Sequence, residues 1–172
     1  MKSLLAEDES ELKKDLDQKK YSYKDTLKCS VDYFNGDELA ATTWMNKYAM
    51  KDSAGDFIEI SPDCMHKRMA KEFGRIEHDY RLKYNLNGSA KFLSKYGQER
   101  EVLDEDKIYN FFKKFKYIVP QGSVMSSLGN HYKLASLSNC IVVPELHDSY
   151  GGVFYTDQQL AQLFKRRCGV GV

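Results

Sequence analysis

The stretch "LASLSNCIVVPELHDSYGGVFYTDQQLAQLFKRRCGVGV", residues 134–172, decides the fold class. Its segment CIVVP, residues 140–144, is apolar and β-branched and lies between polar residues and a proline, which predicts a short buried strand. Residues 148–152 predict a turn. Thr156 is placed to be the N-cap of a last helix, and Leu160, Leu163 and Phe164 are expected to face inward from it. The final segment CGVGV predicts a loop. Because one strand cannot form a sheet, we expect this segment to begin an α/β domain whose other strands come from elsewhere.

The first half of the chain has a helical pattern. Residues 23–34 predict one helix that ends at Asn35-Gly36, and Asp37 is placed to cap the next helix. Ser61 and Pro62 give the clearest helix start in the chain, because serine is a favoured N-cap and proline a favoured first residue. Apolar residues at helical spacing then continue this third helix to about residue 84.

The remaining segments give weaker signals. DFIEI at 56–60 predicts a short extended piece, and NLNGS at 85–89 predicts a loop. Two more helices are predicted, at 89–98 and at 104–117, and residues 120–139 predict turns without a helix. The residues expected to face inward from the helix at 104–117 are Ile108, Phe111, Phe112 and Phe115.

The chain is therefore expected to have three parts. Residues 1–21 are charge-dense and predict a charged arm that is either a frayed helix or disordered. Residues 22–118 predict a helical domain, and residues 119–172 predict the start of the α/β domain.

Composition excludes several classes of protein. The formal net charge of +1 argues against a general nucleic-acid or membrane-surface binder. The sequence has neither the apolar core of a signal peptide nor a run of about 18 apolar residues, so a cytoplasmic protein is expected. The four cysteines and four histidines show no zinc spacing, and no phosphate-binding loop or hydrolase motif is present. We therefore expect no metal site in this chain.

The sequence from about residue 22 to 172 resembles the catalytic (large) subunit of ribonucleotide reductases. The resemblance is carried by WMNKYAMKD, by SPDCMHKRMAKEFGRIE, by FKYIVPQGSVMSSLGN and by the stretch quoted first, in that order. In this family a helical domain leads into a ten-stranded α/β barrel, so the resemblance implies a mainly α domain followed by the first strand-helix unit of that barrel. The sequences of two segments, YFNGDELAATTWMNKYAMKD and VPQGSVMSSLGN, are most similar to the adenosylcobalamin-dependent (class II) branch of the family.

The resemblance implies two sites. Cys140 matches the cysteine that reduces the substrate ribose and then forms a disulfide with a cysteine of a later strand. The residues matched to substrate contacts are Ser123, Asn139 and Gly169, with Cys168 standing where the family usually has Gly or Ala. Asp148 and Ser149 match the turn that holds a deoxynucleoside triphosphate effector.

The resemblance also implies what the chain works with. By this resemblance, the radical-bearing cysteine, the partner of Cys140 and the adenosylcobalamin site are expected in a C-terminal remainder, either of the same chain or in a separate one. Without that remainder the chain is expected to be inactive. A ribonucleoside di- or triphosphate is the implied substrate and a thioredoxin-like protein the implied reductant. No segment matches the regulatory ATP-cone of the family.

Two other hypotheses remain open. The chain could be a non-catalytic helical interaction module whose α/β tail folds on a partner chain, since an unpaired strand is a hazard in an isolated domain. A nucleic-acid binder would use the twelve tyrosines and lysine runs such as KKFK at 113–116, but the near-neutral charge counts against it.

Overall fold

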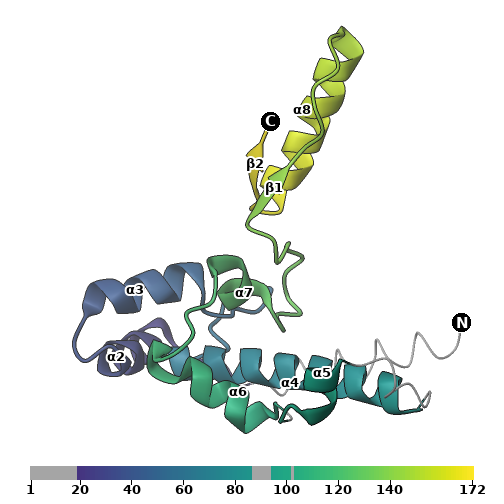
Figure 1. Cartoon of the computed structure of the whole chain (residues 1–172). Helices are drawn as coiled ribbons and strands as arrows, with labels where there is room; N and C mark the ends of the chain where they lie inside the picture. The colour runs from purple at the N-terminus through teal and green to yellow at the C-terminus, as the bar shows by residue number, and fades with distance from the viewer. Residues whose placement is uncertain (1–18, 87–93, 102) are drawn as a thin grey trace, which may run out of the picture. The chain divides into compact units, whose positions relative to one another are not determined.

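The computed structural model describes residues 19–86, 94–101 and 103–172 (Figure 1). The predicted arm at 1–21 lies almost wholly outside the described residues. The chain divides into two compact units, residues 1–62 and residues 63–172, and each is described by itself.

The first unit is built on two paired helices, α2 (Tyr23–Tyr33) and α3 (Glu38–Lys47). The predicted turn between them is confirmed: Asn35 and Gly36 have φ of 55° and 97°, and the Gly36 N–H donates to the Val31 carbonyl at 2.9 Å. The predicted cap is also confirmed, because the Asp37 carboxylate accepts a hydrogen bond from the Ala40 N–H at 2.9 Å.

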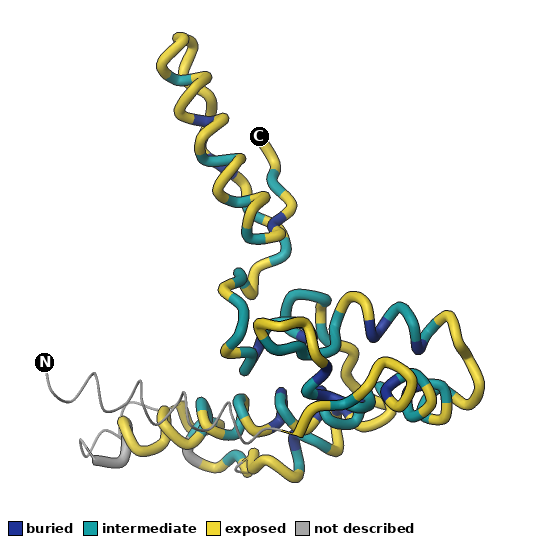
Figure 2. The backbone as a smooth tube through the Cα atoms, turned by 180° about the vertical axis from the view of Figure 1, so that it is seen from behind, coloured by how far each residue is buried: buried dark blue, intermediate teal, exposed yellow. Residues whose placement is uncertain are grey.

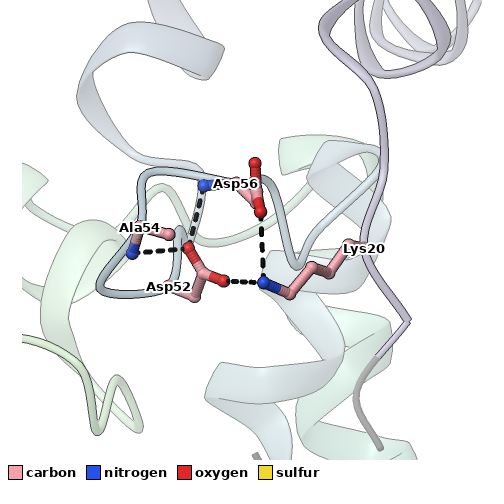
Figure 3. A network of polar contacts seen from close by, with 4 residues as sticks. All are labelled: Lys20, Asp52, Ala54 and Asp56. Carbon is pink, nitrogen blue, oxygen red and sulfur yellow. Dashed lines mark hydrogen bonds and ion pairs between the residues drawn. The ribbon is translucent and has the colours of Figure 1, made fainter. Parts of the chain in front are cut away.

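A polar network closes the loop that follows α3 (Figure 3). The Asp52 carboxylate accepts hydrogen bonds from the N–H groups of Ala54 and Asp56, both at 2.9 Å. The Lys20 ammonium lies 2.6 Å from Asp52 and 3.1 Å from Asp56, so residue 20 is tied to the loop. The predicted extended piece at 56–60 makes isolated bridges at Phe57, to Tyr21 and Lys51, rather than a strand.

The helical part of the second unit is organised by α4 (Pro62–Leu86), which begins where Pro62 predicted. The buried side chains of Met65 and Met69 lie on one face of this helix, as expected from their spacing. The His66 ring is also buried and packs edge-on against Phe115, with ring centroids 4.6 Å apart. Asn85 and Leu86, predicted to be in a loop, continue the helix, and the rest of that predicted loop lies outside the described residues.

The next predicted helices are shorter than expected. The helix predicted at 89–98 is observed as α5 (Lys95–Glu99), and its first residues lie outside the described ranges. The helix predicted at 104–117 is α6 (Glu105–Phe112), followed by a 3-10 turn, η2 (Lys113–Phe115). The α-helix ends at Lys113, whose backbone has φ −46° and ψ 125°, and the next two residues, Lys114 and Phe115, have positive φ of 55° and 54°. Ile108 and Phe112 are buried as predicted, whereas Phe111 is 39% exposed, so its predicted inward position is wrong.

The segment predicted to contain no helix forms one. The helix α7 (Gly122–Ser127) is held by Arg68 of α4, whose guanidinium donates to the carbonyl oxygens of Met125, at 2.8 Å, and Leu128. Met125 and Leu128 are buried, so this tie lies over part of the core of the second unit.

The last part of the chain is a β-α-β unit. Strand β1 (Cys140–Val142) is parallel to β2 (Gly169–Gly171), and helix α8 (Tyr150–Lys165) connects them. The strand predicted at CIVVP therefore exists, but the prediction that CGVGV is a loop is wrong, and the second strand comes from the chain itself. The prediction that the strand is buried is also wrong, since Val142 is 81% exposed.

Helix α8 begins earlier than predicted. Ser149 is its N-cap, and Thr156 lies buried inside the helix rather than at its start. Most of α8 is exposed (Figure 2), including Phe164, which was predicted to face inward. Within the described ranges, no helix has the length and apolar character that a membrane crossing requires.

Candidate functional site

Three of the predicted site residues, Asn139, Cys140 and Gly169, lie at the amino end of the two-stranded sheet. Cys140 is the first residue of β1 and is paired with Gly169, the first residue of β2. The Gly169 N–H donates a hydrogen bond to the Asn139 carbonyl at 2.6 Å. Asn139 directly precedes β1, so this bond holds Gly169 in register with Cys140. A Cβ atom built on Gly169 would lie 3.7 Å from the Cys140 sulfur and 3.3 Å from the Asn139 oxygen. The absence of a side chain at residue 169 therefore leaves the space beside the thiol open.

Asn139 connects this edge of the sheet to the start of α7. Its side-chain oxygen accepts a hydrogen bond from the Ser123 N–H at 3.3 Å, and its amide donates to the Gln121 side-chain oxygen. The Ser123 hydroxyl donates to the Leu137 carbonyl at 2.8 Å. Two predicted contacts, Asn139 and Gly169, thus adjoin Cys140, and Ser123 is joined to Asn139 by a hydrogen bond. The role of Gln121 was missed, and its polar side chain in the turn-rich segment was the one available signal.

The two cysteines of this region have different surroundings. Cys140 is exposed, whereas Cys168 is 4% exposed and its thiol donates to the Ser138 carbonyl, with sulfur and oxygen 3.3 Å apart. Successive residues of an extended chain point to opposite faces, and Gly169 is the residue whose Cβ direction meets the Cys140 sulfur. The Cys168 side chain, one residue earlier, therefore lies on the other face and is not brought together with Cys140.

The predicted effector residues lie at the other end of α8. The Ser149 hydroxyl accepts a hydrogen bond from the Gly152 N–H at 3.0 Å, and the Ser149 carbonyl accepts from Val153 at 3.0 Å. Asp148 is exposed beside this cap. A 16-residue helix is about 24 Å long, and α8 returns the chain from the carboxyl end of β1 to the amino end of β2. Asp148 and Ser149 therefore form a location separate from Cys140.

Comparison with known families places this geometry in context. The family model described as "Ribonucleotide reductase, all-alpha domain" matches residues 34–131, more than half of the chain. The chain belongs to the ribonucleotide reductase family. No curated protein and no solved structure matches it.

The family match covers the helical part of this ribonucleotide reductase chain, from the end of α2 through α7. It relates the chain to the N-terminal region of the large subunit, and hence to oxidoreductases of deoxyribonucleotide biosynthesis. Of the predicted substrate contacts it includes Ser123, while Asn139, Cys140 and Gly169 lie after its last residue. Among the described residues, no group of three His, Cys, Asp or Glu side chains could hold a metal ion.

Proposed function

We propose that this chain supplies the N-terminal part of a ribonucleotide reductase catalytic subunit and that Cys140 is one of two thiols that reduce the substrate ribose. The observation that carries the proposal is the exposed Cys140 thiol at the start of β1, with Gly169 opposite and Asn139 adjacent. A strand holds a side chain more rigidly than a loop does, and a glycine lets a ligand approach the backbone closely.

The chemistry requires a pair of thiols. Replacing a ribose hydroxyl by hydrogen consumes two electrons and two protons, so that one C–O bond breaks, one C–H bond forms, water leaves and two thiols become a disulfide. Cys140 supplies one thiol in this proposal. Cys168 is a poor second thiol because it is buried on the opposite face, so the second thiol comes from the C-terminal remainder.

The radical that begins the reaction is also assigned to the remainder. The branch that the sequence most resembles generates this radical with adenosylcobalamin. The residues of this chain instead bind and orient the nucleotide: Asn139, to which Ser123 is bonded, directly precedes the cysteine, and Gly169 leaves room for the sugar. A thioredoxin-like protein would then reduce the disulfide.

The need for a remainder is supported by the surface of the β-α-β unit. Two short strands bury too little apolar area to be stable alone, and each has an unpaired edge among the described residues. A groove of about 430 Å³ runs between β1 and α8, lined by apolar residues such as Ile141, Tyr155 and Leu163. Val142 and Phe154 are exposed nearby by 81% and 69%. We propose that further strands and helices of the catalytic domain cover this surface.

The proposed effector site is the start of α8. The Asp148 carboxylate can accept hydrogen bonds from a sugar hydroxyl of a deoxynucleoside triphosphate. Loss of effector stimulation in Asp148→Ala, with the unstimulated rate retained, would support this assignment, whereas unchanged stimulation would contradict it.

The main test is an activity assay on the full chain, alone and combined with the C-terminal remainder. Formation of deoxynucleotide from a ribonucleoside di- or triphosphate is followed with dithiothreitol and adenosylcobalamin present. We expect no product from the chain alone and product from the combination. Cys140→Ser should abolish product formation, and the matched control Cys64→Ser, a half-buried thiol of α4, should not. Turnover by the chain alone, or by the Cys140→Ser combination, would refute the proposal.

A further inference from the structure

The residue directly before Cys140 is held at three atoms by two different elements. The Asn139 side-chain oxygen accepts a hydrogen bond from the Ser123 N–H at 3.3 Å, and its side-chain nitrogen donates to the Gln121 side-chain oxygen. The Asn139 carbonyl accepts a third hydrogen bond, from the Gly169 N–H at 2.6 Å. Asn139 therefore joins the start of α7 to the start of β2, one residue before the cysteine.

Hydrogen-bond chemistry allows one orientation of the two side-chain amides. A backbone N–H can only donate, so the Ser123 N–H requires the oxygen of the Asn139 side chain to face it. The nitrogen of Asn139 is then turned toward Gln121 and needs an acceptor there. Gln121 supplies its oxygen, because its own NH2 group in that place would set two donors against each other. Gln121 and Ser123 together thus fix the direction in which the Asn139 amide faces.

The Gln121 side chain has no other structural task among the described residues. Gln121 is the N-cap residue of α7, yet its side chain makes no capping hydrogen bond. The residue is exposed, so its side chain contributes little to the core. Within the described ranges, the one hydrogen bond of this side chain is the one that it accepts from Asn139. Replacing Gln121 should therefore act on Asn139 and not on the fold.

The helix that begins after Gln121 is itself fixed to α4. The Arg68 guanidinium donates to the carbonyl oxygens of Met125 and Leu128. Gly129 follows with a φ of 69°, and a Cβ atom built on it would lie 3.1 Å from Cγ of Arg68. This close packing leaves α7 little room to shift, so Gln121 holds Asn139 from a firm support.

We propose that Gln121 is a positioning residue of the reductase site, which fixes the Asn139 amide so that its second N–H is presented to the nucleotide. Of the two N–H bonds of that amide, one donates to Gln121 and the other has no acceptor among the described residues. An N–H donor suits a hydroxyl oxygen of the ribose, the part of the nucleotide that the reaction changes. The identity of the ligand rests on the proposed function, whereas the hold of Gln121 on Asn139 does not.

The side-chain amide resonances of Asn139 in the full chain provide the first test. We expect these protons to exchange with water about fivefold faster in Gln121→Leu than in the parent, the change produced by loss of one ordinary hydrogen bond. Gln121→Asn, which is one methylene shorter, should behave like Gln121→Leu. Gln121→Glu is the matched control, because a carboxylate on a side chain of the same length still accepts from Asn139, and its exchange should be no faster than in the parent. Equal exchange in all four chains would overturn the proposal.

Kinetics of the chain combined with the C-terminal remainder provide the second test. A misplaced contact at the reacting sugar slows the chemical step, so Gln121→Leu should lower kcat about tenfold or more and change KM by about twofold at most. Gln121→Glu should recover most of the parent kcat. In an Asn139→Ala background Gln121→Leu should cause no further loss, since Gln121 acts through Asn139. An unchanged kcat in Gln121→Leu, an effect on KM alone, or a full additional loss in the Asn139→Ala background would overturn the positioning role.

The positioning role and the proposed function can fail independently. If Gln121 governs the exchange of the Asn139 amide but the parent combination forms no deoxynucleotide, the reductase proposal is wrong and the hold on Asn139 stands. If Cys140 is required for product but Gln121→Leu changes neither the exchange nor kcat, the reductase proposal stands and the positioning role is wrong.

Discussion

Gly152, in the first turn of α8, offers the sharpest structural test. A Cβ atom at this position would lie 2.3 Å from the His147 carbonyl oxygen and 2.9 Å from the His147 Cβ. Van der Waals contact requires a separation greater by about 1 Å, so either the helix start or the preceding turn must move in Gly152→Ala. That turn holds the proposed effector residue Asp148, and Ser149 caps the helix through the Gly152 N–H.

The magnitude follows from two losses. Displacing the Ser149 cap costs about 0.5–2 kcal/mol, and forcing a methyl group into occupied space costs about 1–3 kcal/mol. We therefore expect Gly152→Ala to destabilise α8 by about 2–4 kcal/mol. Gly151→Ala is the matched control, because its new Cβ would meet nothing closer than the Ser149 hydroxyl oxygen at 4.0 Å. Alanine in a helix is favoured over glycine by up to about 1 kcal/mol, so this control should be neutral or stabilising.

Hydrogen exchange of the α8 amides measures the difference directly, because it reports local opening as well as global unfolding. Exchange across α8 should be at least about 30-fold faster in Gly152→Ala than in the parent, and no faster in Gly151→Ala. Equal protection in the two variants would refute the tight approach of the His147 carbonyl to α8.

Three further predictions concern the second unit. Burial lowers the pKa of His66 to about 4 from its usual 6.5, so the unfolded chain binds a proton between these values that the folded chain does not. The free energy of unfolding should therefore fall by up to about 3 kcal/mol as pH drops from 7 to 4. Urea unfolding of His66→Phe should show a weaker dependence of this free energy on pH. A pH dependence identical to that of the parent chain would contradict the assignment to His66. Arg68→Met leaves two carbonyl groups at the end of α7 without their donor and should lower stability by about 1–3 kcal/mol, whereas Arg81→Met, an exposed control, should change the urea midpoint little. Iodoacetamide should modify Cys140 much faster than Cys168 in the native chain, as followed by mass spectrometry, and equal rates would argue against the buried placement of Cys168.

Helix starts were predictable from the sequence where their causes are local. Asp37 and Pro62 act through groups within one turn, so the residue types alone indicated α3 and α4. The end of α6 was not predictable in this way. Lys114 and Phe115 adopt positive φ without being glycine, and nothing in their residue types signals it.

The second strand was missed because its pairing is non-local. Gly169-Val170-Gly171 has the composition of a loop, and its strand conformation depends on hydrogen bonds to β1, which lies across the whole of α8. The start of α8 was missed for a similar reason, since Tyr150-Gly151-Gly152 predicts a turn until Ser149 is seen to cap a helix.

The family resemblance supplied the members of the candidate site but not its geometry, and their roles in the reaction remain predictions. The family resemblance indicated Ser123, Asn139, Cys140 and Gly169; the observed register places the last three at one edge of the sheet, and a hydrogen bond joins Ser123 to Asn139. The resemblance could not distinguish the two faces of that edge, so Cys168 was grouped with Cys140, from which its side chain is directed away.

The one-residue offset between Cys140 and Cys168 has a consequence for oxidation. Neighbouring strands lie about 4.8 Å apart, close enough for two cysteines on the same face to approach disulfide distance, yet these two thiols are on opposite faces. The sheet therefore keeps the two thiols from forming a disulfide with each other. An oxidant that reaches Cys140 will drive it toward a thiol outside the β-α-β unit, on another part of the enzyme or on a second molecule. The alternation of side chains along two short strands thus leaves the exposed Cys140 sulfur free to form a disulfide with a thiol from elsewhere, and keeps it from forming one with Cys168.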